Sequence, residues 1–365
     1  MINPRPIIET LSPYVPGKPA EDVMAEYNLK GVIKLASNEN PLGCSDRAKE
    51  AVIKAMKTPS FYPDGNATKL RAKLSKRLDV NDNQLIFGSG SDELISMIAK
   101  TFISPGDHGI SASLTFPQYK AAVRSMDGIY IGVPNKNFGY DLDAIASAVT
   151  EKTKLIYIAN PNNPTGTMIT HTEQASFVKK IPSSVIIVFD EAYNEYITDE
   201  SFPDTLSMMK TYDNVILFRT FSKMYGLASL RIGYAVGNPI IIDYMNRIRN
   251  PFNVTTVAQV AAIAALEDTE FVKESYQLNE AAKLYTYQKC KELGLSYIES
   301  SCNFVFIDCR HDSQTLFVKL QEKGIIVRPI PHPDTMTYLR ISLGTIKQME
   351  KTLNVLGKLI NKMEA

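Results

Sequence analysis

The segment Val185-Ile-Ile-Val-Phe-Asp190 decides the fold class, because it is an apolar run that ends in a carboxylate. Short runs of this kind, rich in Ile and Val and mostly not alternating with polar residues, are typical of strands buried on both faces of a parallel sheet. Helical segments such as Ser91–Phe102 and Thr172–Lys180 separate them. The other runs are Leu85–Phe87, Gly109–Leu114, Ile129–Val133, Lys154–Ala159 and Val215–Thr220. The sequence therefore predicts an α/β protein whose mostly parallel sheet is sandwiched by helices.

The length of the chain predicts two domains. A single hydrophobic core usually stops growing beyond about 250–300 residues, and this chain has 365. After Asn250 the pattern changes to two helical stretches followed by short strands and helices, which predicts a smaller α/β domain. We expect a Pro-rich, extended N-terminal arm over residues 1–40 that packs with the small domain. A large domain is expected over 41–250, and the small C-terminal domain over 251–365.

The composition excludes several classes of protein. The net charge of +1 gives no reason to expect binding to nucleic acid or to a membrane surface. No apolar run approaches the ~18 residues of a membrane helix, and the first eleven residues do not resemble a secretory signal. The four cysteines form no C-x-x-C pair and the four histidines are scattered, so we expect reduced thiols and no metal. These features favour a cytoplasmic protein.

Residues whose side chains or main-chain N–H groups could bind or react with a ligand follow four of the predicted strands. They lie in Gly88–Glu93, Asn160–Gly166, Asp190–Tyr193 and Phe221–Lys223. In open α/β sheets, ligands bind outside the carboxyl ends of the strands, so these groups are expected to meet there. The segment that follows Lys223 is too short for a crossover helix, which needs about ten residues. The next strand, Arg231–Val236, is therefore predicted to be antiparallel, which returns Arg231 to the edge that carries Lys223.

Each of these groups alone also fits a structural role. Ser91 would cap a helix, Asn160–Gly166 would form a turn, and Lys223 would be a solvated surface residue. Asp190 is more informative, because a carboxylate at the end of an apolar strand is costly unless it is paired. A lysine amine can form a Schiff base with a carbonyl, and a glycine-rich helix N-terminus can hold a phosphate. Together the groups suit a phosphorylated aldehyde with a basic ring nitrogen, which describes pyridoxal 5′-phosphate (PLP).

Short segments between about Leu11 and Gly344 carry a family resemblance. One set looks like the fold-type I PLP-dependent aminotransferases, and it comprises Asn162–Gly166, Asp190–Tyr193, Arg219–Lys223 and Arg231–Tyr234. A second set narrows the resemblance to the histidinol-phosphate aminotransferase family, and it comprises Pro13–Lys18, Ser37–Gly43, Tyr62–Gly65 and Leu339–Gly344. The segments follow one another in the order that the family has. The resemblance implies a fold-type I PLP-dependent transferase.

The resemblance implies a role for each cofactor residue. Lys223 would hold PLP through its amine and carry the substrate proton. Asp190 would pair with the ring nitrogen, while Tyr193 and Asn163 would hydrogen-bond the ring oxygen. The aromatic side chain stacked on the ring would be Phe116, with plain core packing and stacking by Tyr119 as alternatives. The expected phosphate ligands are Ser91 and Asp92 through their main-chain N–H groups, and Ser222 and Arg231 through their side chains.

A second group of residues would bind the substrate. Arg340 lies in an apolar strand, and a buried guanidinium suits a carboxylate. Arg328 is either a second anion ligand or a surface arginine. Tyr62 either reaches the PLP phosphate of a partner subunit, which implies a homodimer, or is an exposed turn residue. The expected substrate-binding residues are Tyr14, Asn40, Tyr62, Asn163, Arg328 and Arg340.

The reaction that the resemblance implies is the transamination of L-histidinol phosphate with 2-oxoglutarate. It would give imidazole acetol phosphate and glutamate, a step of histidine biosynthesis. Two relatives of the same fold would keep every PLP residue, namely an aromatic amino acid aminotransferase and a threonine-phosphate decarboxylase. A nucleotide-binding module whose lysine is structural is the alternative outside this class.

Overall fold

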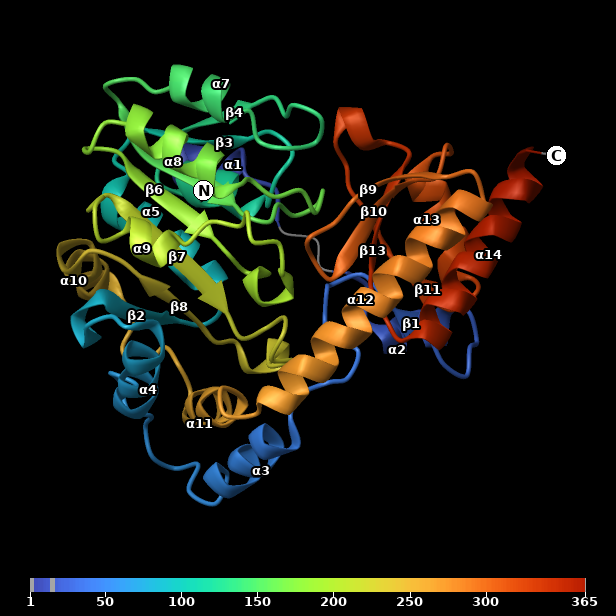
Figure 1. Cartoon of the computed structure of the whole chain (residues 1–365), viewed down its shortest axis with the longest axis horizontal. Coiled ribbons are helices and arrows are strands. Elements are labelled where there is room, and N and C mark those ends of the chain that lie inside the picture. The colour runs from blue at the N-terminus through green and yellow to red at the C-terminus, as the bar shows by residue number, and fades with distance from the viewer. Residues whose placement is uncertain (1–2, 14–16, 365) are drawn as a thin grey trace.

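The computed structural model describes residues 3–13 and 17–364, and Figure 1 shows their arrangement. In this part of the chain, strands form a seven-stranded sheet, a four-stranded sheet and a two-stranded ladder. The seven-stranded sheet, called the large sheet below, has the strand order β2-β8-β7-β6-β5-β3-β4. Its strands are β2 (Leu85–Gly88), β3 (His108–Ala112), β4 (Ile129–Val133), β5 (Thr153–Ala159), β6 (Ile186–Asp190), β7 (Val215–Thr220) and β8 (Gly233–Val236).

Only β8 among these strands runs antiparallel to its neighbours. It pairs antiparallel with both β2 and β7, whereas β7, β6, β5, β3 and β4 pair in parallel. The antiparallel direction predicted for the strand after Lys223 is therefore confirmed. As a consequence, the carboxyl ends of β2, β5, β6 and β7 lie on one edge of the large sheet, and the first residue of β8 lies there too.

Helices cover both faces of the large sheet (Figure 1). Successive residues of β5 pack alternately into two hydrophobic clusters, with Leu155 and Tyr157 in one and Ile156 and Ile158 in the other. This alternation of buried residues explains why the strand is apolar throughout. The helices of this part are α3 (Asp46–Ala55), α4 (Thr68–Leu78), α5 (Ser91–Phe102), α6 (Gln118–Ser125), α7 (Leu142–Ser147), α8 (His171–Lys180), α9 (Thr205–Met208) and α10 (Pro239–Ile248).

The four-stranded sheet, called the small sheet below, is entirely antiparallel and has the order β12-β13-β10-β9. It shares a hydrophobic cluster with residues of three helices. The strands are β9 (Ser296–Ile298), β10 (Phe304–Asp308), β12 (Arg328–Pro329) and β13 (Tyr338–Ser342). The helices are α12 (Thr269–Glu292), α13 (Ser313–Gln321) and α14 (Ile346–Glu364). Figure 1 shows α12 running from the large-sheet part of the molecule to the small-sheet part.

The N-terminal segment differs from the extended arm that its prolines predict. It forms two short helices, α1 (Pro6–Glu9) and α2 (Ala20–Glu26). Pro6 is the first residue of α1, a position that tolerates Pro because its missing N–H has no intrahelical partner anyway. Further along, β1 (Ile33–Lys34) pairs in parallel with β11 (Ile325–Ile326), so this segment joins the C-terminal part of the chain.

The division into domains remains a proposal. Strands of the large sheet all lie within the proposed large domain, 41–250, and strands of the small sheet within the proposed small domain, 251–365. However, α11 (Thr256–Ala265) contributes alanines to the cluster that also holds Ala48 of α3 and Leu70 of α4. We therefore propose that the boundary lies nearer the start of α12. No helix among the described residues is suited to span a membrane, and no group of acidic, His and Cys side chains there is arranged for a metal.

Candidate active site

A phosphate-sized cradle lies between α5 and the start of β8. The N-terminus of α5 follows Gly90, whose φ is +79°. A Cβ on Gly90 would lie 2.3 Å from Nη2 of Arg231, so only glycine lets this guanidinium approach the loop. Nη1 of Arg231 also donates to Oγ of Ser222 at 3.4 Å. The arginine, the serine hydroxyl and the helix N-terminus thus converge, as predicted, and such an arrangement suits an anion.

Ser91 does not cap α5, so the alternative in which this serine is the helix cap is wrong. Gly90 is the N-cap residue and Ser91 is the first residue of the helix. Glu93 instead accepts a hydrogen bond from the main-chain N–H of Ser89 at 2.5 Å. Partial desolvation raises the pKa of Asp92, and the charge of Arg231 partly offsets this shift. The main chain of Ser91 and Asp92 lies at the positive end of the helix dipole.

Asp190 ends β6 with its carboxylate buried. One oxygen, Oδ2, accepts a hydrogen bond of 2.9 Å from the hydroxyl of Tyr119 in α6. The other oxygen, Oδ1, is buried and has no hydrogen-bond partner among the described residues. Burial raises the pKa of Asp190 to about 6, although the bond from Tyr119 opposes this shift. A buried carboxylate oxygen without a partner is costly, and a protonated ring nitrogen of a ligand would satisfy it.

The alternative in which Tyr119 stacks on the cofactor ring does not fit the structure. Its side chain is fully buried, and its ring stacks on Tyr157 with the centroids 4.8 Å apart. It instead provides the hydroxyl that binds Asp190, a role that the sequence did not indicate. Phe116 is only half-buried and meets the ring of Tyr119 edge-on at 5.7 Å. Phe116 is therefore the aromatic side chain that remains available to cover a ligand ring.

Lys223 follows β7, and its amine lies deep between the two parts of the molecule. Nζ donates to the carbonyl oxygen of Ser37 at 3.0 Å and lies 5.8 Å from the ring centroid of Tyr193. Burial, reinforced by the positive charge of Arg340, lowers the pKa of this lysine to about 8. A substantial fraction of the amine is therefore neutral near physiological pH, and the neutral form is the nucleophile.

Asn163 and Tyr193 each have one hydrogen-bonding group fixed by a neighbour. Oδ1 of Asn163 accepts a bond of 2.6 Å from Nη1 of Arg340, so its amide nitrogen remains a donor. The hydroxyl oxygen of the buried Tyr193 accepts a bond of 2.9 Å from Nδ2 of Asn38. Burial raises the pKa of Tyr193, which keeps its phenol protonated. Asn38 is a site residue that the sequence did not reveal.

Arg328 and Arg340 lie directly opposite each other on the adjacent antiparallel strands β12 and β13. Residues in this register point to the same face of a sheet, and like charges placed so closely repel. Arg340 is 8% exposed, and its Nη2 donates to the carbonyl oxygen of Ala36 at 2.6 Å. The structure thus brings the two predicted arginines together, and a negatively charged ligand would relieve their repulsion.

Three other predicted substrate residues have different positions. Asn40 uses both amide hydrogens on the carbonyl of Met224 and the hydroxyl of Ser275, each at 2.8 Å. Its amide thus holds the loop after Lys223, and its expected contact with substrate stays a prediction. Tyr62 is 82% exposed and does not reach the site of its own chain. Tyr14 lies outside the described residues.

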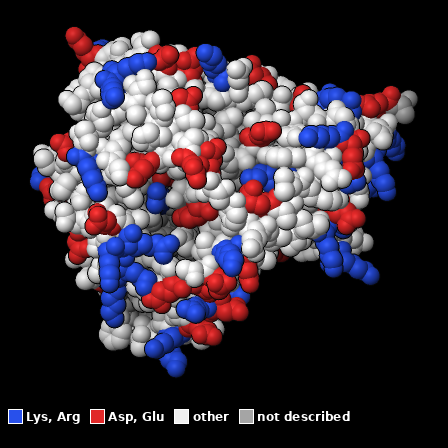
Figure 2. All heavy atoms as spheres, viewed as in Figure 1, with Lys and Arg blue, Asp and Glu red and all other residues white. Residues whose placement is uncertain are grey.

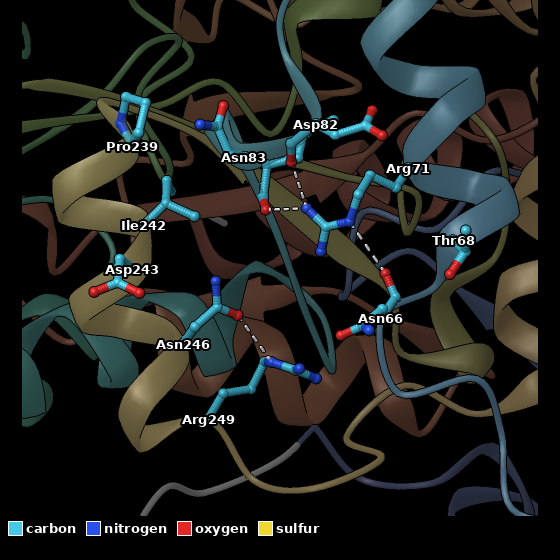
Figure 3. A pocket seen from close by; sticks show the side chains of 11 residues that line it. Asn66, Thr68, Arg71, Asp82, Asn83, Pro239, Ile242, Asp243, Asn246 and Arg249 are labelled. Atoms are coloured by element: carbon cyan, nitrogen blue, oxygen red, sulfur yellow. Dashed lines mark hydrogen bonds between the residues drawn. The ribbon is translucent and has the colours of Figure 1, made fainter.

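A cavity of about 650 Å³ lies elsewhere, between α4, α10 and the turn before β2 (Figure 3). Within it, Nη1 of Arg71 donates to the carbonyl oxygens of Asp82 and Leu85 at 2.7 and 2.5 Å. Nε of Arg249 donates to the side chain of Asn246 at 3.2 Å. No lysine is among the residues that line this cavity, so it lacks the amine that the proposed chemistry needs. The strand-end cluster around Lys223 is therefore the candidate active site.

The residues of that cluster fit PLP. The unpartnered oxygen of Asp190 suits a protonated ring nitrogen, and the cradle at Gly90 suits a phosphate. Lys223, at the same edge of the large sheet, provides an amine of lowered pKa. The donors left on Asn163 and Tyr193 suit a ring oxygen. Each part of the cofactor thus has a chemically matched group in this chain.

Comparisons with known proteins agree with this geometry. The family model described as aminotransferase class I and II matches residues 30–356. A histidinol-phosphate aminotransferase of Caldicellulosiruptor saccharolyticus is 48% identical, over 93% of this chain and 95% of the relative. One from Bacillus subtilis (strain 168) is 42% identical, over 97% of this chain and 98% of the relative.

Solved structures give the same result. A histidinol-phosphate aminotransferase from Sinorhizobium meliloti in complex with PLP superposes with a TM-score of 0.91. It is 27% identical, and the match covers 98% of this chain and 97% of that one. Aspartate aminotransferase from Thermus thermophilus with maleate shares the fold, with a TM-score of 0.84 at 21% identity. The predicted fold class is confirmed, and the chain belongs to the class I and II aminotransferases.

Proposed function

We propose that this chain transfers an amino group from L-histidinol phosphate to 2-oxoglutarate, with PLP as cofactor. The observation that carries the proposal is the cross-strand pair Arg328 and Arg340, of which Arg340 is near enough to lower the pKa of Lys223. The names of the relatives support the same substrate. The products would be imidazole acetol phosphate and glutamate, and the step belongs to histidine biosynthesis.

The chain's own residues would share the work as follows. When bound, PLP supplies a carbonyl carbon for an amine and a ring that accepts electrons from the substrate carbon. Ser222, Arg231 and the N-terminus of α5 hold its phosphate. The carboxylate of Asp190 keeps a proton on the ring nitrogen, because an ionised buried acid gains a charge-assisted bond there. Lys223 would carry a proton to and from the substrate carbon.

The substrate end of the site needs positive charge to bind a phosphate group. Figure 2 shows Lys and Arg side chains intermingled with Asp and Glu side chains over the face in view, and the net charge is only +1. A phosphate monoester carries roughly −1.5 to −2 charges near neutral pH. Selectivity for this group must therefore come from local hydrogen-bond donors. Arg328 and Arg340, which lie opposite each other on β12 and β13, are such donors. Arg340 would also serve the carboxylate of glutamate.

The proposed function is tested by product analysis. Purified protein with PLP is incubated with L-histidinol phosphate and 2-oxoglutarate, and the products are identified by mass spectrometry. Imidazole acetol phosphate and glutamate in equal amounts are expected. Release of carbon dioxide from threonine phosphate would instead identify a decarboxylase. A higher kcat/KM for phenylalanine or tyrosine than for histidinol phosphate would identify an aromatic aminotransferase.

Replacing Arg328 with alanine tests the phosphate contact. We expect kcat/KM for histidinol phosphate to fall roughly ten- to hundredfold, because a charge-assisted hydrogen bond is typically worth about 1.5–3 kcal/mol. A slow reaction with an unphosphorylated aromatic amine should change little. Steady-state kinetics with the two amines measure the ratio. Equal losses for both donors would show that Arg328 has only a structural role.

We also propose a homodimer in which each site is completed by Tyr62 of the other chain. Tyr62 stacks on Phe252 at 4.7 Å, and the neighbouring Phe61 is 75% exposed. Ile53 of α3 and Met56, the residue after this helix, are exposed as well. Large apolar side chains exposed this close together support an interface between subunits.

The dimer proposal predicts an effect of Tyr62→Phe on the cofactor. Losing a hydroxyl donor to the phosphate should weaken PLP binding about tenfold, without changing the oligomeric state. Equilibrium dialysis measures the PLP affinity, and sedimentation at several concentrations measures the mass. A fully active monomer at nanomolar concentration would contradict the proposal.

A cytoplasmic location is a further proposal, supported by the free thiols of Cys290, Cys302 and Cys309.

A further inference from the structure

Asn38 occupies a position from which it contacts several parts of the site. Its side chain is 1% exposed, and its φ is +57°, a left-handed conformation that Asn tolerates better than most residues. Its main-chain carbonyl oxygen accepts a hydrogen bond of 2.9 Å from Nδ2 of Asn303, which precedes β10. The preceding residue, Ser37, accepts the bond from Lys223. The main chain at residues 37 and 38 is therefore held between the lysine and the small sheet.

In the structure, the side-chain oxygen of Asn38 faces Ser342 and its side-chain nitrogen faces Tyr193. The hydroxyl oxygen of Ser342 accepts the main-chain N–H of Asn38 at 2.9 Å. The single hydroxyl hydrogen of Ser342 can then be donated to Oδ1 of Asn38, at 2.8 Å. Nδ2 of Asn38 consequently faces the hydroxyl oxygen of Tyr193, 2.9 Å away. An amide nitrogen can only donate, so Tyr193 is the acceptor in this pair.

This arrangement determines where the hydroxyl proton of Tyr193 goes. We infer that Asn38 is a positioning residue that makes Tyr193 donate its hydroxyl proton into the site, toward the ring oxygen of the cofactor. The inference rests on the proposed function, since it concerns the cofactor of that reaction. Tyr193 cannot donate to Asn38, whose facing group is itself a donor. Its proton therefore points away from Asn38, toward whatever acceptor the site holds.

The inference predicts a change in the bound cofactor rather than only in protein stability. A hydrogen-bond donor to the ring oxygen of PLP withdraws negative charge from this oxygen. The oxygen then stabilises the protonated form of the Lys223 nitrogen that holds the cofactor less well. Losing the donor should raise the pKa of that nitrogen. The visible absorbance of bound PLP follows this protonation, and it is measured in the resting enzyme without substrate.

The test is a double-mutant cycle of Asn38→Gly and Tyr193→Phe, read by a pH titration of the visible band. Glycine keeps the left-handed backbone and adds no charge. We expect Tyr193→Phe to raise the spectroscopic pKa by about one pH unit, the size of one hydrogen bond to a charged group. Asn38→Gly should raise it in the same direction in the wild-type background, and should add nothing in the Tyr193→Phe background.

Two further variants make the result decisive. Asn214→Ala is the matched control, because the buried amide of Asn214 donates to Val185 far from the site, so it should lower the melting temperature without moving the spectroscopic pKa. Ser342→Ala removes the group that orients Asn38 and replaces Asn38→Gly if that variant does not fold. It should shift the pKa in the same direction.

An unchanged spectroscopic pKa in a coloured Asn38→Gly enzyme would overturn the inference alone. Equal shifts in the two backgrounds would also overturn it, because the effect would then not pass through Tyr193. Absence of any visible band from the wild-type protein with PLP would overturn the proposed function, and this inference with it.

Discussion

Replacing Lys223 with alanine is expected to lower turnover by roughly 10⁴-fold or more, because one side chain supplies both the nucleophile and the proton carrier. PLP should still bind noncovalently, since the N-terminus of α5 and Asp190 lie on other elements and Ser222 and Arg231 are retained. Single-turnover kinetics measure the first effect, and equilibrium dialysis with PLP measures the second.

Lys100→Ala is the control for this substitution. Lys100 is exposed near the end of α5, so its loss should leave turnover unchanged. Wild-type turnover in Lys223→Ala would show that the lysine is structural. Loss of all PLP affinity in that variant would contradict the separate role of the phosphate cradle.

Asp190→Asn is expected to lower kcat by roughly 10²- to 10³-fold, with a much smaller change in KM. An amide cannot hold a proton on the ring nitrogen, so the loss is felt in the transition state rather than in substrate binding. Steady-state kinetics separate the two parameters. An unchanged kcat with a raised KM would assign Asp190 to substrate binding instead.

The same substitution should stabilise the protein without PLP, with a defined dependence on pH. The folded chain raises the pKa of Asp190 from 3.8 to about 6, so it binds this proton more tightly than the unfolded chain does. Folding is therefore penalised fully above pH 6 and not at all below about pH 4. Asp190→Asn should raise the free energy of unfolding on the order of 2 kcal/mol at pH 7.5, and hardly at pH 4. Denaturant titration at the two values measures this.

The large sheet could be predicted from the sequence because its signals are local. Each buried strand is a run of apolar residues, and the short connection after Lys223 decides the direction of β8. The polar groups at the strand ends could be assigned to one edge for the same reason. Their chemistry follows from residue type, so Lys223, Asp190 and Arg231 were identifiable as a set.

The contacts that orient these groups could not be predicted, because their partners are distant in the sequence. Tyr119 and Asp190 are 71 residues apart, and Asn38 and Tyr193 are 155 apart. A single sequence carries no signal for such pairs. Nor does it show that Asn40 turns its amide toward Met224, since the main-chain carbonyl it binds belongs to a loop.

The register of the small sheet is a third example. The sequence predicts short strands after residue 250 but not which of them pair. In the structure, β11 pairs with β1, and β12 pairs with β13. Two residues of pairing suffice to bring Arg328 opposite Arg340. Such short ladders depend on the surrounding fold more than on their own sequence.

Reduction of the PLP-loaded protein with borohydride tests the central claim most directly, because it fixes the cofactor on the amine that holds it. Peptide mapping by mass spectrometry then locates the modified residue. The structure predicts one modified position, Lys223, whose amine has the lowered pKa and which follows β7, the strand paired with the end of β6 that carries Asp190. Modification of a different lysine, or of none, would contradict the assignment of the active site.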